Sequence, residues 1–234
     1  MTSFEFNNKK IYEYLGFEIA SIEIEDPIPN IVTESVPYMN GSYDFSNLYG
    51  PVTYEDRIIR VRIRPYDQTI TRRELLYDRY SKLSMWLLSA NRSKLKLDYI
   101  NGYFVGRCSK ISSIELFKLL GYIDIEFKCY PFRYMDNLEG DILWDNFNFE
   151  LDVLQETKFD INVVKNVKIH NVGATNVVPE VICSHQMEVT KGNVTYKFNP
   201  GTSKDYVFEL GIGKNDMTIK GNGTIEFRFR KEVL

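Results

Sequence analysis

The side chains best suited to catalysis or metal binding are scarce in this chain of 234 residues. It holds two histidines, His170 and His185, and three cysteines, Cys108, Cys129 and Cys183. Cys183 and His185 form one C-x-H pair, but a zinc site needs three or four ligands and no second pair occurs. The sequence also lacks a G-x-S-x-G nucleophile elbow. We therefore predict structural roles for both histidines and no metal site.

The three cysteines are widely spaced and odd in number, and no C-x-x-C pair occurs. This pattern does not indicate a disulfide framework. A free cysteine away from reactive partners behaves as a small apolar side chain. We expect three buried thiols.

Acidic side chains are numerous, but their spacing selects no catalytic pair. Glu23 and Glu25 share one face of a predicted strand, and Asp141 and Asp145 lie four positions apart. A glycoside hydrolase places two such acids across a sugar ring. With 32 acidic residues in the chain, solvated surface acids are the simpler interpretation. We predict that the chain is not an enzyme and carries no catalytic residue and no cofactor.

The clearest predicted strand is DRIIRVRIRPY, in which apolar residues alternate with basic ones. Its basic face carries Arg60, Arg62 and Arg64. A nucleic-acid surface is disfavoured because the net charge of the chain is −3. We expect these arginines to pair with acids. Those acids could belong to a neighbouring copy, since arginine is enriched at protein interfaces, and the three arginines are candidate subunit-interface residues.

One helix is predicted over residues 71–89, in TRRELLYDRYSKLSMWLL. Thr71 and Glu74 have the spacing of a capping box, which satisfies free amides of the first turn. Apolar residues recur at helical spacing and form a stripe for burial. The stripe consists of Leu76, Tyr80, Leu83 and Leu87, widened by Leu75 and Trp86.

Further strands surround this helix in sequence. FEF at 4–6 and FEIASIEIE at 17–25 read as extended segments, and a phase slip at Ala20–Ser21 predicts a bulge. LKLDYINGYFVGRC reads as a hairpin with Asn101–Gly102 in its turn. Residues 110–129 add another strand pair. The first half is therefore predicted to be a small antiparallel β-barrel-like domain with one packed α-helix.

A long segment, residues 26–53, shows no periodicity and is punctuated by proline. It contains GSYDFSNLYG, which places Tyr43, Phe45, Leu48 and Tyr49 among turn-forming residues. Long loops in compact domains are usually functional or disordered, and this one is too apolar for disorder. Either these side chains contact another subunit, or the loop folds back over its own barrel.

The second half has the pattern of an antiparallel β-sandwich. From residue 167, turn signals recur between short runs such as VKIHN, VPEVIC, VTYKF, YVFEL, MTIK and TIEFRFR. We expect a first domain over 1–135, an interdomain segment over 136–160 and a C-terminal sandwich over 161–234.

The amino-acid composition is typical of a mainly β protein that binds other proteins. The chain has 16 tyrosines and 15 phenylalanines, residues that favour strands, and tyrosine suits partly hydrated contacts. The start MTSFEFNNKK lacks the apolar core of a signal peptide. The longest apolar run is too short to cross a bilayer. We expect synthesis in a cytoplasm and no membrane contact.

Taken in order, these segments resemble the distal tail protein (Dit) family of long, flexible-tailed (siphovirus) bacteriophages and prophages. The resemblance lies in the segments EDPIPNIVTESVPYMNGSYDFSNLYG, DRIIRVRIR and TRRELLYDRYSKLSMWLL, the link ILWDNFNFE, and the closing sequences VKIHNVGATNVVPEVIC and LGIGKNDMTIKGNGTIEFRFRKEVL. It covers nearly the whole chain. The chain is too short for the large second-domain insertions that act as carbohydrate-binding modules in some family members.

The resemblance implies a structural function in the virion, at the distal end of the tail. Six copies would form a ring through their first domains, as one ring or two stacked rings, with a channel for DNA as cargo. The ring would join the tail tube protein to tail-tip or baseplate components and to a receptor-binding protein. The C-terminal sandwich would be galectin-like.

A carbohydrate-binding sandwich that contributes to host adsorption is the alternative. Exposed aromatic rings can stack on sugars, and the candidate residues are Tyr196, Phe198 and Tyr206. Burial in the sandwich core or cross-strand pairing is the competing interpretation of these rings.

Overall fold

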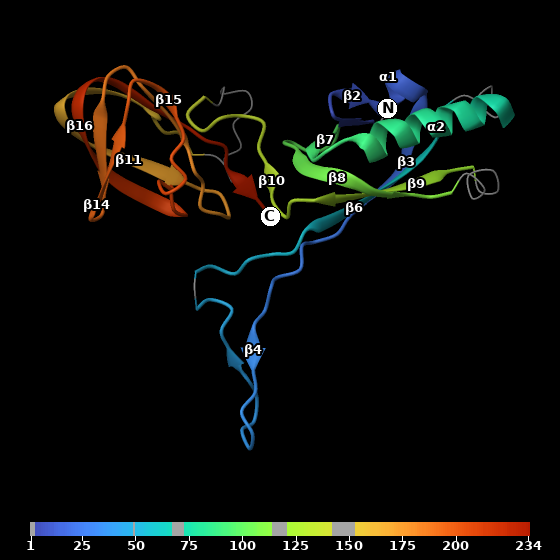
Figure 1. The fold of residues 1–234 in the computed structure, drawn as a ribbon, viewed down its shortest axis with the longest axis horizontal. Helices are drawn as coiled ribbons and strands as arrows, with labels where there is room; N and C mark the ends of the chain where they lie inside the picture. The colour runs from blue at the N-terminus through green and yellow to red at the C-terminus, as the bar shows by residue number, and fades with distance from the viewer. Residues whose placement is uncertain (1–2, 49, 67–72, 114–120, 142–152) are drawn as a thin grey trace. The chain divides into compact units, whose positions relative to one another are not determined.

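The computed structural model describes residues 3–48, 50–66, 73–113, 121–141 and 153–234 (Figure 1). The chain divides into two compact units. Unit 1 spans Met1–Arg133 together with Leu234, and unit 2 spans Tyr134–Val233.

Unit 1 is built on one seven-stranded antiparallel sheet that curls into a half-barrel, in the order β2-β1-β7-β8-β9-β6-β3. The predicted mainly antiparallel β fold is confirmed. The strands are β1 (Phe4–Phe6), β2 (Lys9–Lys10), β3 (Phe17–Ile24), β6 (Arg57–Pro65), β7 (Ser93–Leu97), β8 (Phe104–Ile111) and β9 (Ile123–Cys129).

The strand β6 lies between β9 and β3 and carries the predicted two faces. Ile59, Val61 and Ile63 are fully buried. The pairing of β3 with β6 shifts register between Ile19 and Ser21, so the bulge expected at Ala20–Ser21 is present. A bulge twists and bends the strand that carries it.

The helix α2 (Arg73–Ser89) covers one side of this sheet (Figure 1). Leu76, Leu83, Trp86 and Leu87 are buried in the core of unit 1, and Tyr80 packs against it. Leu75, predicted to widen the buried stripe, is exposed instead. Thr71 of the predicted capping box lies outside the described residues. A five-residue helix that sequence reasoning missed, α1 (Ile11–Leu15), precedes β3 and ends at Gly16, whose φ of 68° favours glycine.

Between β3 and β6, the chain forms a narrow antiparallel arm, which we define as residues 26–56. Two short strands, β4 (Thr33–Glu34) and β5 (Tyr43–Asp44), pair within it. The arm runs away from the sheet of unit 1 (Figure 1).

Unit 2 is a sandwich built around a long ribbon of β11 (Lys158–Asn171) and β16 (Gly213–Arg228), paired along its whole length. One half of β16 also pairs with β12 and the other with β13. The remaining strands of unit 2 are β12 (Glu180–Cys183), β13 (Met187–Lys191), β14 (Val194–Phe198), β15 (Gly201–Ser203) and β17 (Glu232–Val233). The short strand β10 (Arg133–Tyr134), at the boundary of the two units, pairs with β17.

The paired strands β11 and β16 bend in the middle, so that they pass from one layer of the sandwich to the other. Residues at both ends of β11 point into the core, whereas its middle, residues 162–166, is exposed. Such bends let one strand pair serve both sheets of a sandwich. The stretch KGNGT, where a turn was expected between the runs MTIK and TIEFRFR, is therefore a bend inside continuous β16. The run YVFEL contributes a single bridge from Leu210 to Val177 rather than a strand.

Val163 sits at this corner with a φ of 66°, opposite Gly221 in the register. A β-branched residue in the left-handed region is strained. We expect Val163→Asn to stabilise unit 2 by about 1 kcal/mol because asparagine tolerates this conformation. The thermal unfolding transition of unit 2 checks this. Val164→Asn, at an exposed neighbour without a positive φ, is the control. An unchanged or lower transition for Val163→Asn would show that the strain is absent.

Candidate functional site

The arm is held in an extended form by backbone hydrogen bonds at its root. The amide of Glu25 donates to the carbonyl of Ile58 at 3.0 Å. Farther out, the amide of Glu55 donates to Ile28 and that of Asn30 to Thr53, both at 2.8 Å. The arm therefore continues the β3–β6 hairpin beyond the sheet.

Near its tip, local side-chain bonds shape the stretch that carries the aromatic residues. The carboxylate of Asp44 accepts from the amide of Ser46 at 2.8 Å, an Asx turn. The hydroxyl of Ser46 in turn accepts from the amide of Val32 at 2.8 Å on the opposite strand of the arm. Hydrogen bonds from Ser46, first from its side chain and then from its backbone, lower the pKa of Asp44.

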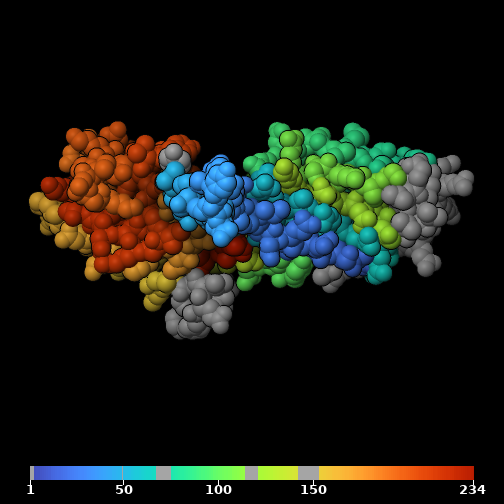
Figure 2. Space-filling model, turned by 90° about the horizontal axis from the view of Figure 1, so that it is seen from below, coloured from blue at the N-terminus to red at the C-terminus, as the bar shows by residue number. Residues whose placement is uncertain are grey.

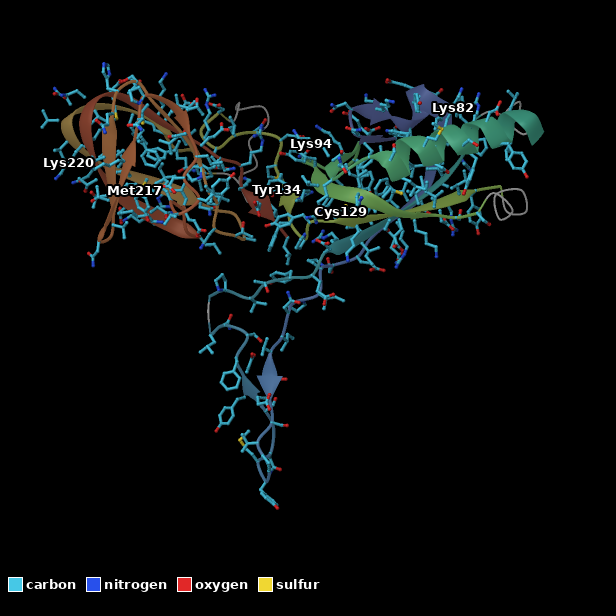
Figure 3. The ribbon with its side chains drawn as sticks, in the orientation of Figure 1. Lys82, Lys94, Cys129, Tyr134, Met217 and Lys220 are labelled. Atoms are coloured by element: carbon cyan, nitrogen blue, oxygen red, sulfur yellow. The ribbon has the colours of Figure 1, made fainter. Side chains whose placement is uncertain are left out.

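The apolar side chains of the arm face solvent. Exposed fractions are 55% for Tyr43, 42% for Phe45 and 62% for Leu48. Tyr49, the fourth predicted residue, lies outside the described residues. Side chains drawn along the arm stand off its ribbon in Figure 3, and the arm's atoms lie uncovered toward the viewer in Figure 2. The alternative in which the loop folds back over its own barrel is therefore wrong for these three residues.

More apolar residues of the arm are exposed than the sequence interpretation singled out. The additional ones are Ile28, Ile31, Val32, Val36 and Tyr38. In the sequence, the only indication of these residues is the high apolar content of a loop without periodicity. That content does not identify which side chains are exposed to solvent. The arm also holds no lysine or arginine, and its acids are Asp26, Glu34, Asp44, Glu55 and Asp56.

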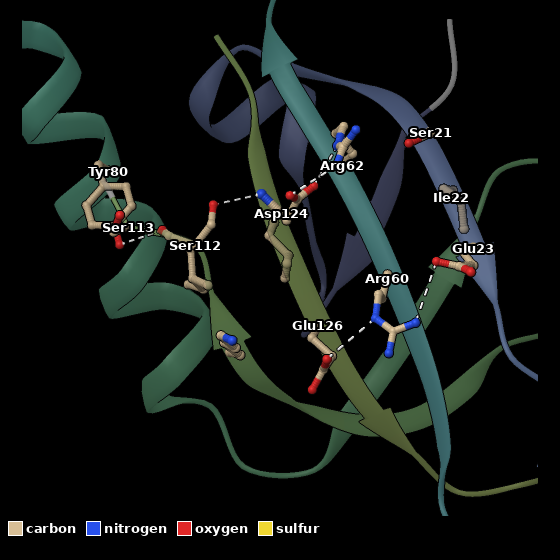
Figure 4. Close-up of a pocket in the computed structure, with 13 residues that line it drawn as sticks. Ser21, Ile22, Glu23, Arg60, Arg62, Tyr80, Ser112, Ser113, Asp124 and Glu126 are labelled. Atoms are coloured by element: carbon tan, nitrogen blue, oxygen red, sulfur yellow. Dashed lines mark hydrogen bonds and ion pairs between the residues drawn. The ribbon is translucent and has the colours of Figure 1, made fainter. Parts of the chain in front are cut away.

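The arginines of β6 form a row of ion pairs with neighbouring strands (Figure 4). Arg60 pairs with Glu25 and Glu23 from the β3 side and with Glu126 on β9. Arg62 holds Asp124 at 2.7 Å, and Arg64 holds Glu18 at 2.7 Å. The acids expected for these arginines thus come from the same chain.

The row of ion pairs ties β6 to the strands on either side of it. Hydrogen bonds raise the pKa of Arg60, chiefly through Glu25, and that of Arg62, chiefly through Asp124. The guanidinium of Arg62 also lies 3.9 Å from the ring centre of Tyr122. Exposed pairs of this kind add little stability individually, but they favour one register.

A hollow of about 900 Å³ is lined by Arg60 and Arg62 of this row and by Tyr80 of α2, whose hydroxyl donates to the carbonyl of Ser112 at 2.9 Å. Arg60 and Arg62 at its wall are engaged by carboxylates of the same sheet. The hollow therefore offers no uncompensated guanidinium to an anionic ligand.

The candidates for chemistry are dispersed or buried. His170 lies half-buried on β11, and His185 contacts the hydroxyl of Ser184. Among the described residues, no three metal-ligating side chains come together. No helix in the described part of the chain is long and apolar enough to cross a membrane.

The three aromatic residues proposed for sugar stacking do not share a surface. Phe198 is 2% exposed and packs edge-on against Phe208, with ring centres 5.4 Å apart. Tyr196 is half-buried and contacts the same phenylalanine. Tyr206 is exposed. A stacking platform that includes Phe198 is thus wrong, because this ring belongs to the core of unit 2.

Comparison with known proteins gives matches in structure but not in sequence. No family model matches the chain, and no curated protein matches it. Among solved structures, the chain is similar to the SPP1 Dit (gp 19.1) protein, described as a paradigm of the hub adsorption apparatus in phages that infect Gram-positive bacteria. The match covers 100% of both chains with a TM-score of 0.68 and 11% identity.

Chains of the phage p2 baseplate in its activated conformation, with Sr and with Ca, also match. Their TM-scores are 0.45, with 10% and 9% identity, over 98% of each of those chains and 99% and 100% of this one. The match to SPP1 Dit, at a TM-score of 0.68 over both full chains, shows that this chain shares that fold.

The cysteines allow a direct test of their structural role. All three are free and buried, and desolvation raises the pKa of Cys108 and Cys129 to about 12 and that of Cys183 to about 11. Because the thiolate is the reactive form, we expect no thiol to react with a disulfide reagent at pH 8 in the folded protein. All three should react after denaturation. Rapid labelling of any one in the folded state would contradict this placement.

Proposed function

We propose that this chain is a structural, non-enzymatic component of the distal end of a bacteriophage tail. In this proposal, copies assemble through unit 1 into a six-membered ring. The ring joins the tail tube to tail-tip and receptor-binding proteins and leaves a central channel for DNA. The observation that carries the proposal is the full-length likeness to the fold of SPP1 Dit.

The arm provides a physical reason for self-assembly. A soluble monomer gains nothing from displaying a run of apolar side chains on a narrow projection, whereas an assembly buries them. In a closed ring, each copy offers one surface to the next in a head-to-tail contact. The arm of one protomer would lie on its neighbour, with Tyr43 and Phe45 as aromatic anchors.

The charge of the arm limits the kind of protein surface to which it can bind. Its acidic residues are not balanced by any lysine or arginine within the arm, although Asp56 at its root pairs with Arg92 at 2.9 Å. A strongly acidic receiving surface would repel it. The receiving surface should therefore be apolar at its centre, with neutral or basic residues around it.

Arg60, Arg62 and Arg64 stay candidates for the same interface. Their ion pairs with acids of their own chain leave remaining N–H groups for a neighbour, because each guanidinium has five donors. Their first role in this proposal is to hold the sheet that carries the arm.

Self-assembly is tested by light-scattering mass on a sizing column over a range of protein concentrations. We expect a species at six or twelve times the chain mass of 27.4 kDa, whose shape electron microscopy would resolve. Tyr43→Ala/Phe45→Ala should weaken assembly by roughly tenfold or more, because aromatic anchors dominate interfaces.

The same double variant should leave the thermal transition of the monomer nearly unchanged, since both rings are exposed. Tyr206→Ala/Val207→Ala, which removes two exposed side chains of unit 2, is the control and should assemble normally. A large loss of thermal stability with assembly intact would mean that the arm serves the fold of its own chain.

A further inference from the structure

The outer side of α2, which faces away from the core of unit 1, carries exposed apolar side chains. Met85 is 72% exposed, and Leu88, which lies three positions farther along and is therefore its neighbour on the helix surface, is 51% exposed. The exposed ring of Tyr14, from α1, lies next to the helix, with its centre 5.5 Å from that of Trp86. Since the other side of α2 already belongs to the core, the helix is apolar on two sides and buries only one of them within its own chain.

A hollow of about 550 Å³ opens beside this face. It is lined by Tyr14, Met85 and Trp86, by Lys9 and Lys82, and by polar or small residues, and no lining residue is acidic. Lys82 lies on the surface of α2 in Figure 3. A pocket of this volume can admit large side chains of a partner, and methionine is common at such surfaces because its flexible side chain adapts to the group that binds. The face therefore combines apolar side chains with positive charge at its edge.

The tip of the arm has the complementary composition. The rings of Tyr43 and Phe45 lie 6.2 Å apart, and Asp44 stands between them in the chain. Glu34 lies opposite Tyr43 in the register of β4 and β5, so a second carboxylate accompanies the same aromatic pair. Because the arm carries acids and no lysine or arginine, a positive surface attracts it and an acidic one repels it. Both Tyr43 and Met85 are exposed in the same chain, so a contact between the arm and α2 joins two copies.

We propose that the outer face of α2, together with this hollow, receives the arm of a second copy. One aromatic ring of the arm tip would enter the hollow beside Met85, while Lys9 and Lys82 attract the carboxylates of the tip. Each chain then offers one arm and one receiving face, which are different surfaces, so the contact repeats head to tail and can close into a ring. The inference rests on the proposed self-assembly and names the surface at which it takes place.

The contact is tested by placing a photoreactive group in the arm of the full chain. Phe45 is replaced by a diazirine-bearing phenylalanine, and copies labelled with the heavy nitrogen isotope are mixed with unlabelled copies before irradiation. Mass spectrometry of the cross-linked peptides identifies the residue that the arm touches, and the isotope pattern shows whether that residue belongs to another copy. We expect cross-links between different copies, from the arm to the outer face of α2 or to Tyr14.

A pair of substitutions at one exposed position tests the role of charge. Met85→Glu places a carboxylate on the receiving face and should lower the yield of these cross-links by roughly fivefold or more, because it repels the acidic arm. Met85→Lys, with similar helix propensity, should lower the yield less. Val207→Glu makes the same kind of change at an exposed residue of unit 2 and should cross-link as the parent does. Thermal unfolding of each variant confirms that the fold is retained.

The results separate this contact from the ring itself. Cross-links at the α2 face without a stable species of six or twelve copies in light scattering would support the contact and contradict the ring. A stable oligomer whose arm cross-links map elsewhere, or only within one copy, would overturn the inference and leave the ring intact. Absence of cross-links between copies, or an unchanged yield in Met85→Glu, would also overturn the inference.

Discussion

The pairing of β3 with β6 is the constraint on which the rest of unit 1 depends. These two strands enter and leave the arm, so their register fixes where its root emerges. Buried Ile59, Val61 and Ile63 anchor β6 from the core side, since a one-residue slip would expose all three. The ion pairs on the opposite face select the same register. Packing and charge therefore specify one position for the arm.

The sheets of both units enclose an apolar core, whereas no residue of the arm belongs to either core. The cores of both units are made of residues that alternate along strands, with partners on neighbouring strands or on α2. The arm is too narrow to have an inside, because two strands alone cannot bury a face. Its apolar side chains need a surface that its own chain does not supply. This division separates the residues that maintain the fold from those available for contacts.

Periodicity predicted the elements that bury one regular face. It identified β6, the bulge in β3, the helix stripe and the presence of a second, all-β unit. Periodicity gave the wrong prediction where contacts with other parts of the fold determine the conformation or burial of a residue. KGNGT has turn composition, yet pairing with β11 carries the strand through it, and Leu75 has helical spacing but lies beyond the sheet's reach. The exposure of Tyr43 and Phe45 could not be read from sequence because local composition does not reveal whether a loop has a surface to cover.

The composition of the arm has a consequence for its survival outside an assembly. Exposed, extended backbone is the form that proteases cleave most readily. The arm contains no lysine or arginine, so trypsin-like enzymes find no site between Asp26 and Asp56. Chymotrypsin-like enzymes meet several exposed aromatic side chains there. In a free subunit, the arm would be cut by chymotrypsin-like enzymes and not by trypsin-like enzymes, and docking of the arm would protect it from both.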